Sequence, residues 1–226
     1  MCGRYALSIE QQEMLEIYVA NLFLDDWRSR YNIAPTQEAP VLVQKDGELG
    51  IRPFRWGLVP FWAKDPSIGN RMINARSETV AEKPSFRTAW KHGRRCLVLA
   101  DAFYEWQKPA SGKGPKTPHA IRLADERPFG LAGLWESWDG EGGELRTFTI
   151  LTSEPNELLR PIHNRMPVIL GDRDAWEAWV DPDVPPGELE ELLGPYRPEE
   201  MQAYPVSTYV NNPGNEGEEC LRRVPD

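Results

Sequence analysis

Short apolar segments, each followed by a turn signal, fill the middle of this chain. They read "CLVLADAFYEWQK", with a turn at Asp101, then "HAIRLA", "FGLAGLWESW" and "LRTFTILT", and "DGEGGE" supplies the turn of the last pair. Such segments, alternating with turns rich in Gly and Asp, are typical of β-strands joined as hairpins. Antiparallel strands need only short connections, whereas parallel strands need long crossovers. The pattern therefore predicts sheets that are mainly antiparallel.

The flanking sequence adds further strands and a few short helices. A strand over residues 3–7 precedes a helix, for which Ser8 and Gln11 form a capping box. "PTQEAP", which ends at Pro40, reads as a turn-rich loop, and "VLVQ" and residues 49–54 read as a hairpin that turns at "KDGE". "NELLRPI", "DAWEAWV" and "GELEELLG" read as short helices. Strands outnumber helices, so we predict a mainly antiparallel α+β domain.

The acidic charge of the chain is concentrated toward its C-terminal end. Residues 181–226 hold 11 Asp or Glu against 3 Lys or Arg, whereas residues 1–180 hold 24 acids against 23 bases. The near-neutral first part leaves room for one basic groove among its arginines, although scattered solvated arginines explain the count equally well. We expect one folded domain over residues 1–211 and a loose acidic tail over residues 212–226.

Composition bounds the class of protein. With 226 residues, 40% of them hydrophobic, and nine Trp, the chain can bury a substantial core. No apolar run approaches the roughly 18 residues of a membrane span, and the N-terminus lacks a signal-peptide pattern, so we expect a cytoplasmic protein without membrane contact. The chain has an odd number of cysteines, Cys2, Cys96 and Cys220, which argues against a disulfide framework. It has no C-x-x-C motif, so zinc binding is not suggested. No metal or cofactor is expected.

The chain opens with "MCGRY", which places a cysteine directly after the initiator Met. Aminopeptidases remove Met before a small residue, and removal of Met1 would give Cys2 both a thiol and a free α-amino group. An α-amino group has a pKa near 8, so part of it is neutral and nucleophilic at physiological pH. With an aldehyde the amine forms an imine, and the thiol then closes a five-membered thiazolidine intramolecularly. The alternative is that Cys2 is an incidental small hydrophobic residue.

Two further side chains suit proton transfer. Glu105 lies between two aromatic residues in "YEW", where desolvation would raise the pKa of the carboxyl group toward the range of a general acid or base. His163, in "RPIHNRMPVIL", can be neutral or protonated near pH 7, and Arg165 beside it could hold a phosphate. An ordinary surface Glu and a structural His are the alternatives.

A third group of residues could contact a substrate. In an extended "NARSET", Asn74 and Arg76 point to the same side and could hold a sugar and a phosphate, although Ser77 could simply cap a helix there. Trp62 lies in "GLVPFW", on a segment without periodicity, where an exposed aromatic ring can stack on unpaired bases. The alternative for Trp62 is a place in the core.

Taken together, "MCGRY", "RYNIAPTQ", "RWGLVPFWAKD", "NARSET", "FYEW" and "HNRMPVIL" resemble the SOS-response-associated peptidase (SRAP) family, whose members act on abasic sites in single-stranded DNA. The likeness runs from residue 2 to about residue 210 with every block in order. It implies an α+β fold with a barrel-like antiparallel core and peripheral short helices. The acidic C-terminal segment departs from what a DNA-binding surface needs, which leaves its place and role open.

The resemblance also implies roles for the residues singled out above. Cys2 would crosslink to the aldehyde of an abasic site through a thiazolidine and so protect the lesion. Asn74 would position the N-terminal residue or the sugar, Glu105 would assist proton transfer at the amine, and His163 would protonate the sugar ring oxygen. The resemblance implies phosphate contacts by Arg4, Arg76 and Arg165, and wedging or stacking of bases by the loop of Pro40 together with Trp62. Arg71 is a further implied DNA contact. The implied partner is single-stranded DNA containing abasic sites, bound by a monomer that is nucleoid-associated when on DNA.

The family name adds a peptidase that exposes Cys2 by self-cleavage, and a lyase activity on abasic sites is a further expectation. Two other functions stay open. One is a binding module for single-stranded or modified DNA in which Cys2 is idle. The other is a glutamine amidotransferase of the N-terminal-nucleophile type, which also begins Met-Cys-Gly. Arg4 after Gly3, and the lack of any Asn-Gly in the chain, disfavour the amidotransferase.

Overall fold

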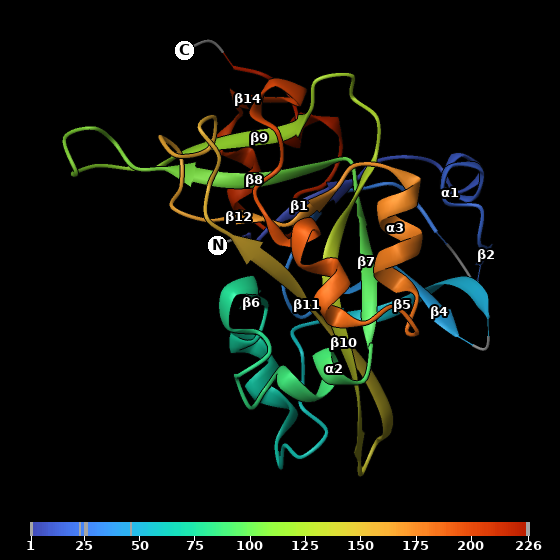
Figure 1. Cartoon of the computed structure of the whole chain (residues 1–226). Helices are drawn as coiled ribbons and strands as arrows, with labels where there is room; N and C mark the ends of the chain where they lie inside the picture. The colour runs from blue at the N-terminus through green and yellow to red at the C-terminus, as the bar shows by residue number, and fades with distance from the viewer. Residues whose placement is uncertain (1, 23, 25–26, 46, 225–226) are drawn as a thin grey trace.

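The computed structural model describes residues 2–22, 24, 27–45 and 47–224 of the chain. Two sheets form the body of the protein (Figure 1). The smaller sheet is antiparallel and has the strand order β14-β9-β8-β1-β3. Its strands are β1 (Tyr5–Leu7), β3 (Arg30–Ile33), β8 (Ala102–Gln107), β9 (Thr117–Leu123) and β14 (Met201–Pro205).

The larger sheet closes on itself. It has the order β12-β11-β10-β7-β4-β5-β2, and a parallel pairing of β11 with β5 joins its two sides into a barrel. β13 and β6 pair with β10 and β11. The strands are β2 (Asn21–Leu22), β4 (Glu38–Lys45), β5 (Glu48–Trp56), β6 (Asn74–Arg76), β7 (Arg95–Ala100), β10 (Phe129–Gly140), β11 (Gly143–Ser153), β12 (Met166–Pro167) and β13 (Ile169–Leu170). The predicted α+β fold with a barrel-like, mainly antiparallel core is confirmed.

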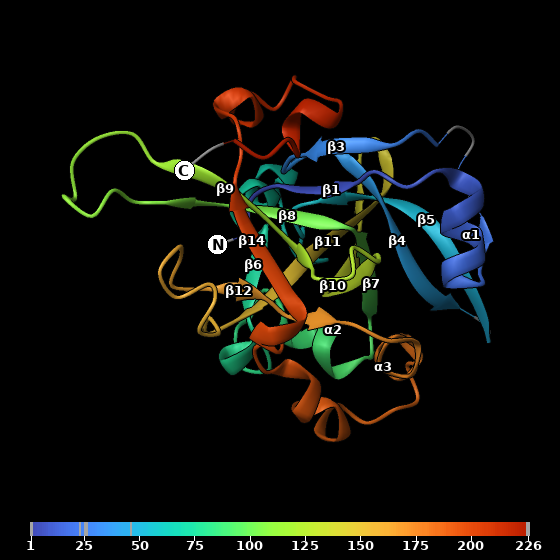
Figure 2. The same cartoon turned by 90° about the horizontal axis from the view of Figure 1, so that it is seen from above.

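The helices are short and lie outside the sheets (Figures 1 and 2). The α-helices are α1 (Gln11–Tyr18), α2 (Arg87–Lys91) and α3 (Arg173–Val180). The 3-10 helices are η1 (Pro66–Arg71), η2 (Ser77–Thr79), η3 (Pro186–Leu193), η4 (Pro198–Glu200), η5 (Thr208–Asn211) and η6 (Glu218–Cys220). Packing on the strands stabilises helices of this length, because short helices are marginal on their own.

Both hairpins predicted from turn signals are present. β4 pairs with β5 from Glu38↔Arg55 to Lys45↔Glu48, and β10 pairs with β11 from Gly133↔Ile150 to Gly140↔Gly143. Asp46, in the predicted "KDGE" turn, lies outside the described residues. Trp56 at the end of β5 then joins the two sheets, because its ring stacks on Phe148 of the barrel and meets Tyr5 of β1 edge-on. This contact fixes the N-terminal strand against the barrel.

The turn expected at Asp101 is a crossing from one sheet to the other. β7 belongs to the barrel and β8 to the smaller sheet, so the two strands do not pair. The Asp101 carboxylate between them is buried and accepts hydrogen bonds from the backbone N–H, at 2.8 Å, and the hydroxyl of Ser8. Ser8 therefore forms no capping box with Gln11, and α1 begins without a side-chain cap. A buried carboxylate needs hydrogen-bond donors, which is why Ser8 is used here.

Candidate functional site

Cys2 lies three residues before the start of β1, and its side chain is fully buried. Its thiol points at the backbone oxygen of Arg4, with 3.9 Å between the sulfur and the oxygen. Its own carbonyl oxygen accepts a hydrogen bond of 2.8 Å from the side-chain amide of Asn74. The position of the residue is thus fixed from two sides, by its own strand and by β6. Met1 lies outside the described residues.

The pairing of β1 with β8 brings Glu105 to Cys2. Tyr5 is opposite Phe103 and Ala6 is opposite Ala102, and the Tyr104 N–H donates to the Arg4 carbonyl at 2.9 Å. Continued beyond these pairs, the same register sets Glu105 across from the residues next to Cys2. Glu105 is only 3% exposed, so the prediction of a desolvated carboxyl group is confirmed in its geometry.

Burial changes the acidity of both groups. It raises the pKa of the Glu105 carboxyl to about 7, which leaves this group about half ionised at neutral pH. Burial also raises the pKa of the Cys2 thiol, and the Glu105 carboxylate raises it further because two negative charges would repel each other. The thiol therefore stays protonated at neutral pH. A reaction at Cys2 must begin with another nucleophile or include transfer of the thiol proton.

His163 lies on the other side of Glu105. Its Nε2 is 3.9 Å from Glu105 Oε2, and its Nδ1 accepts a hydrogen bond of 3.1 Å from the Arg165 backbone N–H. Partial burial lowers the pKa of His163. Burial therefore shifts the two groups in opposite directions: it raises the pKa of Glu105 and lowers that of His163.

Asn74 and Arg76 share one side of β6, as predicted for an extended segment. β6 pairs in parallel with β11, with Asn74 opposite Ile150 and Arg76 opposite Thr152. Ala75 between them is buried, whereas Arg76 is exposed. Among the described residues, the buried Asn74 Oδ1 has no hydrogen-bond partner. Ser77 begins η2 and caps no helix with its side chain. Asn74 thus has one polar atom left for a ligand.

Two of the arginines expected at phosphates are held by the protein itself. Arg165 pairs with the Glu78 carboxylate through both terminal nitrogens, at 2.6 and 2.8 Å, and also donates to the Thr152 carbonyl. Arg4 donates through Nη1 to Asn32 Oδ1 at 2.7 Å and to the Val210 carbonyl at 2.8 Å. Their role at phosphates stays a prediction, and a phosphate would have to compete with these partners.

The other predicted DNA contacts lie on different elements. Pro40 lies on a strand and not on the predicted loop: it is a buried residue of β4, opposite Pro53, and lines a cavity of about 280 Å³. Trp62 does lie on a loop and is 48% exposed, with the neighbouring Phe61 54% exposed. Arg71 ends η1 and is exposed. Pro40 fits β4 because it lies just before the residues of β4 that pair with β7, where no ladder hydrogen bond to β7 is required.

A close approach of two backbones fixes the base of the Trp62 loop. Gly57, at φ +121°, lies so near the Gly69 carbonyl that a β-carbon would come within 2.5 Å of its oxygen. The Val59 N–H donates to the Thr147 hydroxyl at 2.9 Å. Only glycine tolerates both the positive φ and the contact. The exposed aromatic residues are therefore presented from an anchored loop.

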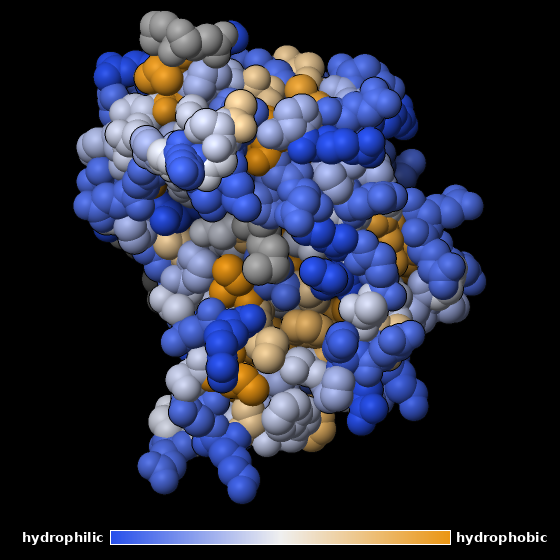
Figure 3. All heavy atoms as spheres, turned by 90° about the vertical axis from the view of Figure 1, so that its left-hand side faces the viewer, coloured by the Kyte–Doolittle hydropathy of each residue, from blue (hydrophilic) through white to orange (hydrophobic). Residues whose placement is uncertain are grey.

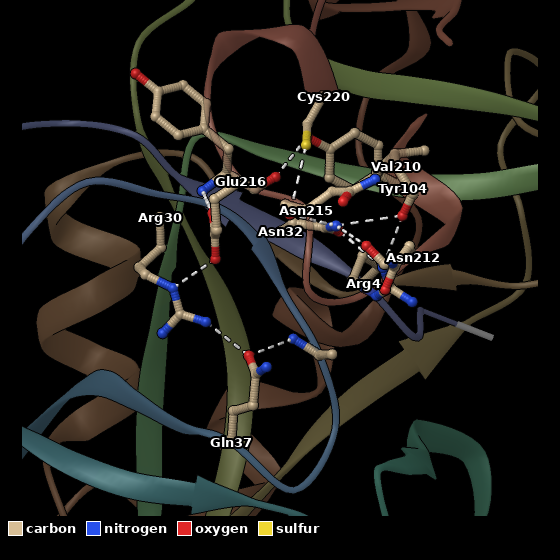
Figure 4. Close-up of polar contacts among 12 residues, drawn as sticks. Arg4, Arg30, Asn32, Gln37, Tyr104, Val210, Asn212, Asn215, Glu216 and Cys220 are labelled. Carbon is tan, nitrogen blue, oxygen red and sulfur yellow. Dashed lines mark hydrogen bonds and ion pairs between the residues drawn. The ribbon is translucent and has the colours of Figure 1, made fainter. Parts of the chain in front are cut away.

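The C-terminal segment, for which composition predicts a loose tail, packs against the smaller sheet. Asn32 of β3 is fully buried, and its Nδ2 donates to the carbonyls of Val210, Asn212 and Asn215 at 3.3, 2.9 and 2.9 Å (Figure 4). Cys220 is buried in the same region. The hydrogen bonds from the buried Asn32 amide to backbone carbonyls order the segment despite its acidic charge. Residues 225–226 lie outside the described residues.

Glu216 extends this contact to the surface. Its carboxylate accepts from Arg30 Nε at 2.8 Å and from the Tyr31 N–H at 2.7 Å (Figure 4). The acidic segment thus neutralises an arginine of β3. Asn32 was missed in the sequence, although "RYNI" carried a signal: one uncharged polar residue inside an otherwise strand-like stretch. We name Asn32, Arg4, Val210, Asn212 and Asn215 the Asn32 cluster.

Among the described residues, no group of His, Cys, Asp or Glu side chains could hold a metal ion. No helix in the described ranges is long and apolar enough to cross a membrane. Four separate segments bring Cys2, Asn74, Glu105 and His163 together.

Comparison with known proteins gives consistent matches. The family model described as "SOS response associated peptidase (SRAP)" matches residues 1–213. The abasic site processing protein YoqW of Bacillus subtilis is 43% identical, over 98% of this chain and 99% of that protein. The abasic site processing protein HMCES of Xenopus tropicalis is 34% identical, over 88% of this chain and 68% of that protein. A crystal structure of a Bacteroides thetaiotaomicron protein superposes with a TM-score of 0.88 and 27% identity, covering 99% of this chain and all of that one.

Proposed function

This chain belongs to the SOS response associated peptidase family, and from that premise we propose that it processes abasic sites in single-stranded DNA by crosslinking to them through Cys2. The observation that carries the proposal is the convergence of four groups: Cys2, the Asn74 amide that holds its carbonyl, and the Glu105–His163 pair. Such a set fits the conversion of an aldehyde into a stable covalent adduct. The adduct would protect the lesion until repair.

The first requirement is a free α-amino group on Cys2. In a chain that starts at Met1 this nitrogen is part of a peptide bond, so Met1 must be removed, either by an aminopeptidase or by the protein itself. The hydrogen bond from Asn74 to the Cys2 carbonyl does not involve this nitrogen. Asn74 therefore keeps Cys2 in place before and after removal of Met1, and Glu105 lies beside the new terminus.

The reaction then proceeds in two bond-forming steps. In the ring-opened abasic sugar the C1′ aldehyde is attacked by the Cys2 amine, a C–N bond forms, and the aldehyde oxygen leaves as water to give an imine. The thiol sulfur then adds to the imine carbon while its proton passes to the nitrogen, which closes the thiazolidine. One water is lost overall. The protonated state of the thiol fixes the order, because the amine is the stronger nucleophile while the thiol holds its proton.

Glu105 and His163 move the protons that these steps require. The Glu105 carboxylate, with a pKa of about 7, accepts a proton from the α-ammonium group and returns it to the departing oxygen. His163 passes a proton to the sugar ring oxygen as the ring opens. The 3.9 Å between the two side chains is long for proton transfer, and catalytic hydrogen bonds often shorten only when substrate binds.

Closing the thiazolidine also explains how strand cleavage is avoided. An imine at C1′ promotes β-elimination of the 3′ phosphate, which is lyase chemistry. Addition of the thiol removes the C=N bond on which that elimination depends. The thiol thus selects crosslinking over cleavage, and any lyase activity of this protein comes from imine that has not yet closed.

The test is a denaturing gel with single-stranded oligonucleotides. One carries a natural abasic site, and the other carries a tetrahydrofuran analogue, which has no aldehyde. The expected result is a heat-stable, slower band with the natural site alone. No band with either oligonucleotide, together with binding to both, would establish the non-covalent binding module. No binding to either would call for an assay of glutamine hydrolysis.

A further inference from the structure

A basic pocket adjoins the Glu105–His163 pair. It has a volume of about 290 Å³ and opens between the end of β8, the loop that joins β8 to β9, and the segment before β12. Its lining residues are Trp106, Lys108, Lys116, Arg160, Pro161, Ile162, His163 and Asn164. His163 belongs both to this pocket and to the proposed site, so the two are continuous.

Three of the lining residues are cations and none is an acid. Lys108, Lys116 and Arg160 are all exposed, and the structure gives their side chains no hydrogen bond or ion pair within its described ranges. This separates them from Arg165 and Arg4, whose guanidinium groups are already engaged by Glu78 and the Asn32 cluster. On a chain of net charge −9, three exposed cations around one hollow that no acidic residue lines are an anion-binding arrangement.

The lysines are also close enough to act on the proposed catalytic pair. The positive charge of Lys116 lowers the pKa of both Glu105 and His163, and that of Lys108 lowers the pKa of His163. An anion held by these lysines would therefore lie beside the reacting sugar. Figure 3 looks onto this side of the molecule, the left of Figure 1, where hydrophilic atoms cover most of the surface.

We propose that this pocket binds a backbone phosphate of the DNA strand next to the abasic sugar. The inference rests on the proposed function, since it names where that substrate continues beyond Cys2. The indole of Trp106 forms the apolar wall of the pocket, and its back is held by a hydrogen bond of 2.7 Å to Asn211 and by Arg4, 5.8 Å from the ring centre. A wall held in place and three exposed cations suit a sugar and its phosphate, with no reading of base sequence.

The test compares two triple variants that each lose three positive charges. The pocket variant is Lys108→Ala/Lys116→Ala/Arg160→Ala, and the matched control is Lys83→Ala/Arg87→Ala/Lys91→Ala, whose residues are exposed on and before α2. Binding is measured by fluorescence anisotropy with the tetrahydrofuran oligonucleotide across a salt series. The pocket variant is expected to bind about tenfold more weakly, and its salt slope to fall by about 0.7 for each phosphate that it no longer neutralises. Equal losses in both variants would overturn the proposal.

A neutral linkage locates the phosphate. Methylphosphonate replaces one linkage at a time on either side of the tetrahydrofuran residue. At the proposed position it weakens binding to the wild-type protein but adds little to the defect of the pocket variant. If each neutral linkage costs both proteins the same, the phosphate lies elsewhere and the proposal fails.

Because the analogue has no aldehyde, this test is independent of crosslinking. If the wild-type protein crosslinks and the pocket variant binds as well as wild type, the phosphate site is ruled out and the proposed function stands. If the wild-type protein forms no crosslink but the pocket variant alone binds more weakly, the phosphate site stands and the proposed function is ruled out. Circular dichroism of both triple variants checks that they fold. The variant Lys108→Arg/Lys116→Arg keeps both positive charges, so it should bind as the wild type does and not as the pocket variant does.

Discussion

The proposed site around Cys2 and the Asn32 cluster both adjoin β1, and they treat polar groups in opposite ways. In the Asn32 cluster one buried amide has four hydrogen-bond partners, and Tyr104 adds a bond of 2.8 Å from its hydroxyl to the Tyr31 carbonyl. In the proposed site, Glu105 and Cys2 have raised pKa values, and Asn74 has a buried oxygen with no partner among the described residues. The first arrangement stabilises, whereas the second leaves groups poised for a substrate.

The two regions should therefore tolerate substitutions differently. A satisfied polar cluster adds to the free energy of unfolding, and losing a partner leaves a buried group unpaired. A desolvated acid costs stability and gains reactivity. We therefore expect changes in the proposed site to alter the reaction with little effect on stability, and changes in the Asn32 cluster to do the opposite.

The largest effect is expected at the thiol. Cys2→Ser keeps the amine but cannot form a thiazolidine, so the heat-stable adduct should disappear while DNA binding stays within about twofold of wild type. Cys220→Ser is the matched control, because Cys220 is a buried free cysteine beside the Asn32 cluster. The gel assay checks both. A stable adduct with Cys2→Ser would rule out ring closure.

Glu105→Gln should slow adduct formation on the order of 10²-fold, the lower end of general acid–base contributions. The wild-type rate should rise as pH increases through about 7, because only the ionised carboxylate accepts the α-ammonium proton. In Glu105→Gln the midpoint should move to about 8, the ordinary pKa of an α-amino group. The measurement is the rate of adduct formation from about pH 6 to about pH 9. The same midpoint in Glu105→Gln as in wild type would show that Glu105 does not accept the proton.

His163→Ala should slow adduct formation on the order of tenfold to 10²-fold with natural abasic sites, because ring opening loses its proton donor. Ring opening is bypassed by an oligonucleotide in which carbon replaces the 4′ oxygen of the abasic residue, because its aldehyde cannot close a ring. The defect should shrink with this substrate in single-turnover experiments. An equal defect with both substrates would place His163 in another step.

In the Asn32 cluster the effect should move to stability. Asn32→Ala removes the buried amide's hydrogen bonds to Arg4 and to three carbonyls, so the free energy of unfolding should fall by about 2–3 kcal/mol. Urea denaturation measures the loss, and Asn74→Ala serves as the contrast, with a smaller loss of stability and a larger loss of rate. If the two variants exchange these behaviours, the division between the regions is wrong.

The smallest effect is expected at the edge of the C-terminal segment. Glu216→Gln removes the charge that Arg30 faces, with both side chains partly exposed, so the free energy of unfolding should fall by less than about 1 kcal/mol. The loss should be smaller still at high salt, which screens exposed charges. Denaturation at two salt concentrations is sufficient. A large, salt-independent loss would mean that Glu216 is integral to the Asn32 cluster.

The sequence predicted what depends on local pattern. Turn residues and alternation gave the two hairpins, and the order of Asn74 and Arg76 along an extended segment gave their shared side. The chemistry of an N-terminal cysteine beside a carboxylate and a histidine could likewise be reasoned from residue types. Their contacts needed the fold, because β1, β6, β8 and the segment before β12 are far apart in the chain.

The sequence failed where tertiary contacts override composition. The tail is acidic and rich in turn residues, yet one buried Asn from β3 orders it. Pro40 reads as a loop residue, yet β4 accommodates it opposite Pro53, just before the pairing with β7 begins. Arginine counts did not show which cations were already paired: Arg165 and Arg4 are engaged, whereas Lys108 and Lys116 line the pocket beside His163 without a hydrogen bond or ion pair of their side chains in the described ranges.

The central claim is that Cys2, freed of Met1, is the reagent. Intact-mass spectrometry of the purified protein, before and after incubation with a single-stranded oligonucleotide carrying one abasic site, tests it most directly. We predict loss of the Met1 mass, followed by a gain equal to the oligonucleotide less one water. A protein that has lost Met1 and gains no mass, under conditions where it binds the oligonucleotide, would contradict the account.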